Sequence, residues 1–244
     1  MGTSTARVVR WHDVECGGYE ADLPLWRALA TAAGGDVLDV GCGTGRVALD
    51  LARAGHAVTG LDRDPALVQA LRERAAGLPV TAVEADARAF ALGRRFALIV
   101  VPMQTVQLLG GAEGRAAFLC CARDHLAPGA PLALAVADAL EGFEASAPEA
   151  LPLPDLGKHD GWVFSSQPVA VRERGDRLAI ERIRQAVAPD GTMDATGDVV
   201  ELDRLDGATL AAEGEAVGLG AEPPRRIAPT DDHVGSEVVI LRAP

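Results

Sequence analysis

Residues 36–55 join a short apolar strand, a loop with glycine at every second position and a helix pattern. The strand DVLDV runs directly into GCGTG, and RVALDLARAG follows with helical spacing of its apolar residues. Glycine lets the backbone turn sharply and lets a ligand lie against it, and the first N–H groups of the helix are unpaired. This order of elements predicts a ligand site at the carboxyl end of a strand in a parallel sheet.

The same alternation continues along the first half of the chain. Apolar strands are predicted at residues 57–62, 80–86, 96–102 and 130–138, and helices at 22–33, 65–77 and 112–129. Continuous apolar strands that alternate with amphipathic helices are typical of a parallel sheet covered on both faces. We therefore expect an α/β fold with a doubly wound, Rossmann-like sheet.

The pattern changes after Asp138. Residues 139–161 are rich in Pro, Ala and Glu and predict a loop, whereas residues 162–205 predict three antiparallel strands separated by Gly-Asp and Pro-Asp-Gly turns. A helix at 207–218 and strands near 222–228 and 236–243 follow. The expected organisation is an N-terminal helical lid (1–33), a main domain (34–138 and 206–244) and an inserted antiparallel substrate cap (139–205).

Composition narrows the classes of partner. The formal net charge of −12 and the lack of a Lys/Arg run argue against nucleic-acid binding. No segment has the roughly 18–20 apolar residues of a membrane span, and the first residues do not resemble a signal peptide. The four cysteines form no CxxC pair, so we expect neither a metal site nor disulfides, and a cytoplasmic protein.

Three acidic positions follow successive predicted strands. Asp39 precedes the glycine loop, Asp62 ends the second strand, and Asp86 follows the third. An acid at the end of the second strand is placed to reach ribose hydroxyls. The loop reads GCGTG rather than the GxGxxG that is usual for dinucleotides.

With these motifs, the sequence resembles the class I S-adenosylmethionine-dependent methyltransferases of the small-molecule type. VLDVGCGTGR, GLDRDP, EADARAF and IVVP followed by MQTVQLL are similar to successive motifs of that family. The resemblance is close over residues 22–138 and looser at the final helix and strands. It implies a seven-stranded sheet with the last strand antiparallel, and S-adenosylmethionine as the cofactor.

The resemblance also implies roles for particular residues. Asp39 and the backbone of the glycine loop would hold the methionine part of the cofactor, Asp62 its ribose, and Arg63 would lie beside the adenine. Asp86 and Ala87 would contact the adenine edge, and the segment from Val101 to Gln104 would line the methionine part. The full set of expected cofactor-binding residues is Asp39, Gly41, Cys42, Gly43, Gly45, Asp62, Arg63, Asp86, Ala87, Val101, Pro102 and Gln104.

Simpler structural roles are available for several of these residues. Asp62 could cap the helix that begins at Pro65, although Asp64 is better placed for that. Asp86 could be a turn residue, and Arg46 could lie on a helix surface. Cys42 is expected to be a small loop residue rather than a nucleophile.

The acceptor determines whether a base is needed, since an amine must only be neutral whereas a hydroxyl needs a general base. His56 and His125 fall in helix-to-strand connections away from the ligand edge, and His159 is unplaced. Three catalytic candidates remain: His233, in the turn before the last strand, and Tyr19 and His12, in the N-terminal segment.

The sequence thus predicts methyl transfer to a small molecule, with an amine nitrogen as first choice and a hydroxyl as second. The segment after the fourth strand lacks the Asn-Pro-Pro-Tyr type motif of base-methylating enzymes. Two alternatives stay open, an NAD-type oxidoreductase on the same sheet and a non-catalytic cofactor-binding module. A monomer and a homodimer are both compatible with the sequence.

Overall fold

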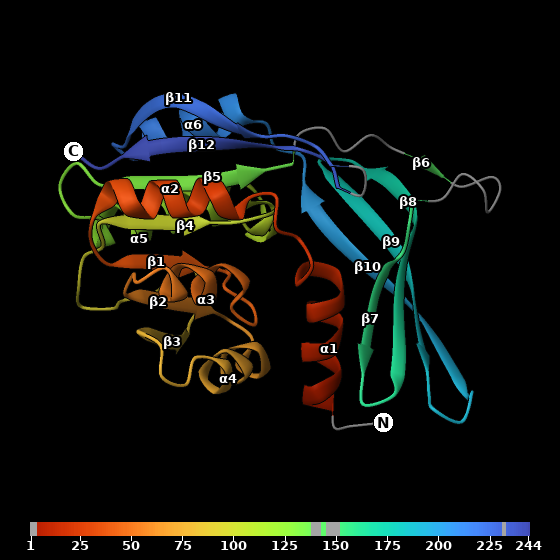
Figure 1. Ribbon diagram of the computed structural model, residues 1–244. Helices are drawn as coiled ribbons and strands as arrows, with labels where there is room; N and C mark the ends of the chain where they lie inside the picture. The colour runs from red at the N-terminus through yellow and green to blue at the C-terminus, as the bar shows by residue number, and fades with distance from the viewer. Residues whose placement is uncertain (1–3, 138–142, 145–151, 231–232) are drawn as a thin grey trace.

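The computed structural model describes residues 4–137, 143–144, 152–230 and 233–244, which form two sheets (Figure 1). The first sheet has seven strands in the order β11-β12-β5-β4-β1-β2-β3, and the second has five. The strands of the first sheet are β1 (Val37–Val40), β2 (Val58–Asp62), β3 (Val80–Glu84), β4 (Leu98–Val101), β5 (Pro131–Val136), β11 (Gly220–Ile227) and β12 (Ser236–Arg242).

Strands β1 to β5 are parallel, and β12 is antiparallel to both β5 and β11. The predicted fold class, a seven-stranded sheet with an antiparallel last strand, is confirmed. The order of the strands reverses between β1 and β4, so the loops that follow these strands diverge at the carboxyl edge. That edge is where ligands bind in sheets of this type.

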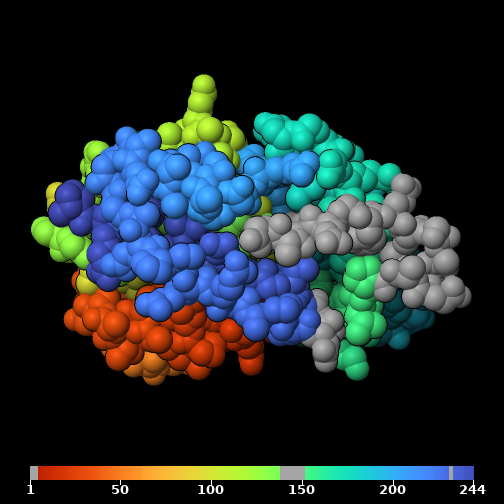
Figure 2. All heavy atoms as spheres, turned by 90° about the horizontal axis from the view of Figure 1, so that it is seen from above, coloured from red at the N-terminus to blue at the C-terminus, as the bar shows by residue number. Residues whose placement is uncertain are grey.

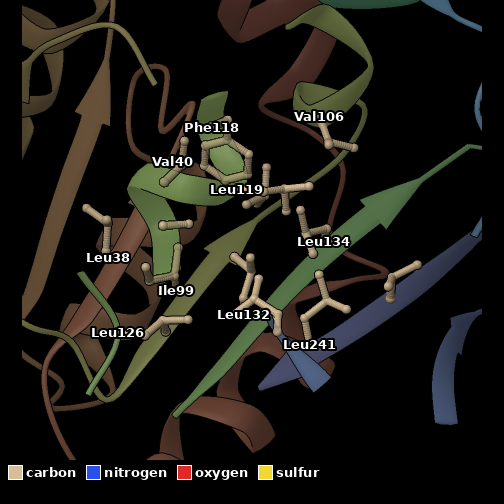
Figure 3. Close-up of a cluster of buried hydrophobic side chains, with 14 of the residues drawn as sticks. Leu38, Val40, Ile99, Val106, Phe118, Leu119, Leu126, Leu132, Leu134 and Leu241 are labelled. Carbon is tan, nitrogen blue, oxygen red and sulfur yellow. The ribbon is translucent and has the colours of Figure 1, made fainter. Parts of the chain in front are cut away.

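Helices cover both faces of the first sheet. The helices of the described part of the chain are α1 (Ser4–Cys16), α2 (Leu23–Ala33), α3 (Arg46–Arg53), α4 (Pro65–Arg74), α5 (Gly111–His125) and α6 (Gly207–Ala216), with a 3-10 helix, η1 (Thr105–Leu108). Trp26 of α2 and Leu51 of α3 pack on one face with Leu98 of β4. Phe118 of α5 packs on the other face with Ile99 (Figure 3). Consecutive residues of β4 therefore enter opposite cores, which explains the continuous apolar strand sequences.

The second sheet contains the predicted antiparallel strands. Its members are β6 (Phe143–Glu144), β7 (Asp155–His159), β8 (Trp162–Arg174), β9 (Arg177–Val187) and β10 (Met193–Asp203). Strands β6 and β7 lie inside the segment that the sequence predicts as a loop, so that prediction is wrong at both; residues 139–142 and 145–151 lie outside the described part. Asp160 and Gly161, with φ of +47° and +80°, form the hairpin turn from β7 to β8. This Asp-Gly pair is a hairpin signal that was overlooked.

Helix α1 lies between the two sheets (Figure 1). Its Trp11 packs edge-on against Phe164 of β8, with ring centroids 5.4 Å apart. Its Glu15 accepts hydrogen bonds of 2.6 and 2.7 Å from Arg184 of β9. From above, the teal strands of the second sheet lie at one end of the molecule (Figure 2). No described helix is long and apolar enough to cross a membrane.

Candidate active site

The glycine loop connects β1 to α3 with three residues in the left-handed region. Gly41, Gly43 and Gly45 have φ of +71°, +54° and +100°. A Cβ at Gly41 would lie 2.4 Å from the Thr105 side chain, and one at Gly43 would lie 2.1 Å from Nε2 of His12. Only glycine fits where these side chains approach the loop so closely.

A cavity of about 420 Å³ opens at the carboxyl ends of β1 to β4. The loops after these strands form its floor. Helix α1 contributes His12, Glu15 and Cys16, and the second sheet contributes Ile180, Arg182, Val200 and Leu202. The cavity is therefore enclosed between the two sheets, and the residues of its far wall come from the inserted segment.

Most of the expected cofactor residues line this cavity. Those that do are Asp39, Gly41, Cys42, Asp62, Arg63, Asp86, Ala87, Pro102 and Gln104. Gly43, Gly45 and Val101 are not part of the lining. His12 lies over Gly43, Gly45 faces Leu71, and Val101 is completely buried in the core beside α5.

Asp39 has an unusual environment. Its side chain is 1% exposed, and within the described part of the chain neither carboxylate oxygen has a hydrogen-bond partner. Burial raises the pKa of Asp39 from 3.8 to about 7, although the nearby Arg46 opposes that shift. A buried carboxylate without partners is costly, and it lines a cavity. A cationic or hydrogen-bond-donating ligand group would satisfy it.

Asp62 and Asp86 lie at the ends of neighbouring strands. The N–H of Gly43 donates to Oδ2 of Asp62 over 2.9 Å, and the N–H of Asp64 donates to Oδ1 over 3.0 Å. Asp64, not Asp62, caps α4 by accepting from the N–H of Ala66. Asp62 is thus free of the capping role and fixed on the cavity side of the glycine loop.

Asp86 accepts hydrogen bonds from the backbone and side chain of Arg88. These bonds lower the pKa of Asp86 to about 2, so the group is ionised at neutral pH. Asp86 therefore forms a turn, which was the simpler structural role considered for it, and it also lines the cavity. After β4, Met103 also lines the cavity with a φ of +55°, a conformation that residues other than glycine adopt rarely.

The three catalytic candidates separate in the structure. His12 lines the cavity, and burial lowers the pKa of its imidazole. Tyr19 and His233 do not contribute to the lining that the described residues form. Their rings contact each other with centroids 4.9 Å apart, and the guanidinium of Arg46 lies 5.3 Å from the Tyr19 ring centroid. The structure therefore brings one of the three candidates, His12, to the cavity.

Sequence reasoning missed two polar groups of the cavity lining, Glu15 of α1 and Arg182 of β9. The half-buried Glu15 accepts from Arg184 and from Ser166, whose hydroxyl donates over 2.7 Å. Arg182 donates to Asp155 of β7 over 2.8 Å. Neither residue could be placed at the cavity from sequence, because the packing of α1 on the second sheet has no local sequence signal.

Cys42 is a buried loop residue whose thiol pKa is raised by burial, which does not favour a thiolate nucleophile.

The described residues contain no group of three or more His, Cys, Asp or Glu side chains arranged to hold a metal ion. His125 has a structural role, since its ring accepts from the N–H of Leu92 and packs on Phe90.

Comparison with known proteins supports a class assignment. Residues 37–129 match the family model described as the methyltransferase domain. CalS10, a methyltransferase for an amino pentose from Micromonospora echinaspora that is involved in calicheamicin biosynthesis, is similar over 97% of both chains, with a TM-score of 0.73 and 21% identity. Its structure was solved with S-adenosylmethionine bound.

Two further solved structures have the same fold. The sugar N-methyltransferase KedS8 of a Streptoalloteichus species has a TM-score of 0.72 and 20% identity, with coverage of 97% of this chain and 92% of its own. The glycopeptide N-methyltransferase MtfA, bound to S-adenosylmethionine, has a TM-score of 0.61 and 22% identity over 91% and 87%. Residues 37–129 therefore carry a methyltransferase-domain match, and the chain as a whole shares its fold with these S-adenosylmethionine-dependent methyltransferases.

Proposed function

We propose that this enzyme transfers a methyl group from S-adenosylmethionine to an amine nitrogen of a small molecule. The observation that carries the methyl-donor part of the proposal is the unpartnered, buried carboxylate of Asp39 in a cavity lined on its far side by the second sheet. The similar structures named above, an amino pentose methyltransferase and two N-methyltransferases, support the choice of an amine. A sugar-like amine is the acceptor class that we favour.

The cavity residues fit the cofactor. Asp39 would accept from the ammonium of the methionine part, and the narrow backbone at Gly41 would lie against it. Asp62 would bind the ribose hydroxyls, and the ionised Asp86 would accept from the adenine amino group. When bound, the cofactor supplies an electrophilic methyl group on a sulfonium, so the protein must mainly align the acceptor and exclude water.

In this proposal, walls on two sides of the cavity align the acceptor and exclude water. Residues 139–205 act as a substrate cap in this proposal, because Ile180, Val200 and Leu202 form an apolar wall on the side of the cavity opposite the sheet edge. Residues 1–33 would form a lid, with α1 between the cap and the main domain. Closure between these walls would keep water from the reacting atoms.

His12 is our candidate proton acceptor. An ammonium must lose a proton before its nitrogen can attack a methyl group. Since burial lowers the pKa of His12, the imidazole is neutral near pH 7 and can accept that proton. We assign no catalytic role to Tyr19 or His233, which pack against each other beside Arg46.

Calorimetry with S-adenosylmethionine, S-adenosylhomocysteine and NAD tests the cofactor assignment. Micromolar affinity for the first two and none for NAD is expected. Mass spectrometry should then detect a mass increase of one methylene, with S-adenosylhomocysteine, on a panel of amino sugars. Matched sugars with a hydroxyl in place of the amine provide the comparison, and methylation of these alone would overturn the amine proposal.

A further inference from the structure

The chain passes between the two sheets at two places. It leaves the first sheet after β5 and returns from β10 to α6. Both crossings meet at the side chain of Gln107, which is 1% exposed. Its Nε2 donates to the carbonyl oxygens of Asp203 over 3.1 Å and Ala137 over 3.4 Å. Its Oε1 accepts from the N–H of Ala137 over 3.0 Å.

A second layer of polar groups supports the end of β10. Oδ2 of Asp203 accepts from the N–H of Gly111 over 2.7 Å and from Arg115 over 2.8 Å. Arg115 is buried on α5 and also donates to Glu213 of α6 over 2.6 and 2.7 Å. The position of Asp203 is thereby fixed by η1, α5 and α6 together.

The neighbours of this cluster in the sequence line the cavity. Thr105 and Leu108, on η1 with Gln107, lie on one side, and Val200 and Leu202 of β10 lie on the other. Leu108 is 47% exposed although it is next to the fully buried amide of Gln107. Successive residues of a 3-10 helix point in directions about 120° apart, so one side chain can hold the cluster while the next faces the cavity.

We propose that Gln107 is a positioning residue that sets the distance between η1 and β10, the two walls of the acceptor end of the cavity. This rests on the proposed function, since it assigns that end to the acceptor. The single side chain of Gln107 bonds the N–H and the carbonyl oxygen of Ala137 after β5 and the carbonyl oxygen of Asp203 at the end of β10. An apolar side chain at this position could make none of these bonds. Without them, buried N–H and carbonyl groups at both crossings lose their partners, and β10 can shift relative to η1.

The cofactor end of the cavity does not depend on this clamp. Asp39 lies in β1, Asp62 is the last residue of β2 and Asp86 follows β3, and these strands are held by the first sheet. Loss of the clamp should therefore affect acceptor use far more than cofactor binding. A general loss of structure would affect both.

The test compares Gln107→Met, of similar length, and Gln107→Glu with the wild type. Both should lower kcat/KM for the acceptor by about tenfold or more, because small misplacements at a reacting centre have large effects on rate. The Kd of S-adenosylmethionine should change by less than about twofold. Gln69→Met, at an exposed glutamine of α4, is the matched control and should change neither quantity.

Hydrogen exchange gives a readout that needs no acceptor. In both Gln107 variants, the amide of Ala137 and the amides at the end of β10 should exchange faster, while those of β1 and β2 stay protected. Unchanged exchange at these sites, or unchanged acceptor kcat/KM, would overturn the proposal. An equal loss of cofactor and acceptor affinity would also overturn it, in favour of a purely structural role. A wild-type enzyme that methylates no amine would refute the proposed function instead, and the exchange data would still decide on the clamp.

Discussion

The guanidinium of Arg46 donates two hydrogen bonds to the carboxylate of Asp22, over 2.5 and 2.7 Å. The Arg46 side chain is 9% exposed and that of Asp22 is 1% exposed. Asp22 also accepts from the indole of Trp26, and Arg46 donates to the carbonyl oxygen of Tyr19. This pair joins the start of α3, directly after the glycine loop, to the connection between α1 and α2.

Replacement of Arg46 by Met should be strongly destabilising. Removing one partner leaves the buried Asp22 carboxylate without its ion pair, at a cost of about 3–5 kcal/mol. Urea denaturation measures the free energy of unfolding. The control is Arg27→Met, which removes the more exposed pair with Asp50 and should have a much smaller effect, because solvent screens an exposed ion pair. Equal effects of the two substitutions would contradict the assigned importance of burial.

Asp39 should make stability fall and cofactor affinity rise with pH. Because its pKa is raised from 3.8 to about 7, the folded protein retains a proton that the unfolded chain has lost over this range. The free energy of unfolding therefore falls as pH rises from about 4 to 7. Asp39→Asn cannot ionise, so without cofactor it should be more stable than the wild type at pH 8, by about 1–3 kcal/mol, and equally stable near pH 4.

The same variant should bind the cofactor poorly. Loss of a charge-assisted hydrogen bond predicts about 10–100-fold weaker binding of S-adenosylmethionine at pH 8. Affinity of the wild type should increase as pH rises through about 7, whereas that of Asp39→Asn should not. Calorimetry at several pH values measures both, and parallel pH profiles would refute the role given to Asp39.

Two neighbouring aspartates allow a matched test of the ribose site. Asp62→Ala should abolish measurable cofactor binding while the fold is retained. Asp64→Ala removes only the cap of α4, and it should lower stability by about 1 kcal/mol with cofactor affinity unchanged. Circular dichroism and calorimetry separate the two effects. Unchanged affinity in Asp62→Ala would rule out our assignment of the ribose site.

His12 should determine the acidic limit of the reaction with an ammonium acceptor, because the imidazole accepts a proton only when it is neutral. In His12→Gln, kcat should fall by about 10²–10⁴-fold, the usual contribution of a positioned acid or base. Activity should recover partly at high pH, where the free acceptor is already neutral. A kcat–pH profile with the same shape in both enzymes would show that His12 only packs on the glycine loop.

The contact of α1 with the main domain should control cofactor release. Asp13 accepts from Arg74 over 2.6 and 2.8 Å and from the Thr44 hydroxyl over 2.8 Å. Asp13→Ala should speed the dissociation of S-adenosylhomocysteine by about 5–10-fold, since roughly 1 kcal/mol of closing contacts is lost. Stopped-flow displacement measures this rate. The control is Arg10→Ala, which removes an ion pair between α1 and Asp160 in the turn that joins β7 to β8. It should leave the dissociation rate of S-adenosylhomocysteine unchanged.

The alternating strands and helices of residues 36–138 were predictable from sequence because their patterns are local. Leu98 and Ile99 enter different cores, and that requires continuous apolar strands whatever the rest of the chain does. The glycines at 41, 43 and 45 were also readable, since only glycine adopts these φ values beside a close neighbour. Strand β7 was missed because DLGKH forms a strand only when the Asp160–Gly161 turn folds it onto β8.

The sequence by itself determined the alternating strands and helices of the sheet and the positions of the acids at the ends of β1 to β3, since these follow from hydrophobic period and chain order; the antiparallel last strand was implied by the family resemblance. Only the tertiary structure decided which distant groups meet. It brought His12 to the cavity while pairing Tyr19 with His233 outside the described lining, and it turned Arg46 into a buried partner of Asp22. These contacts join segments far apart in the chain, and they depend on how helices pack on sheets, which no local pattern encodes.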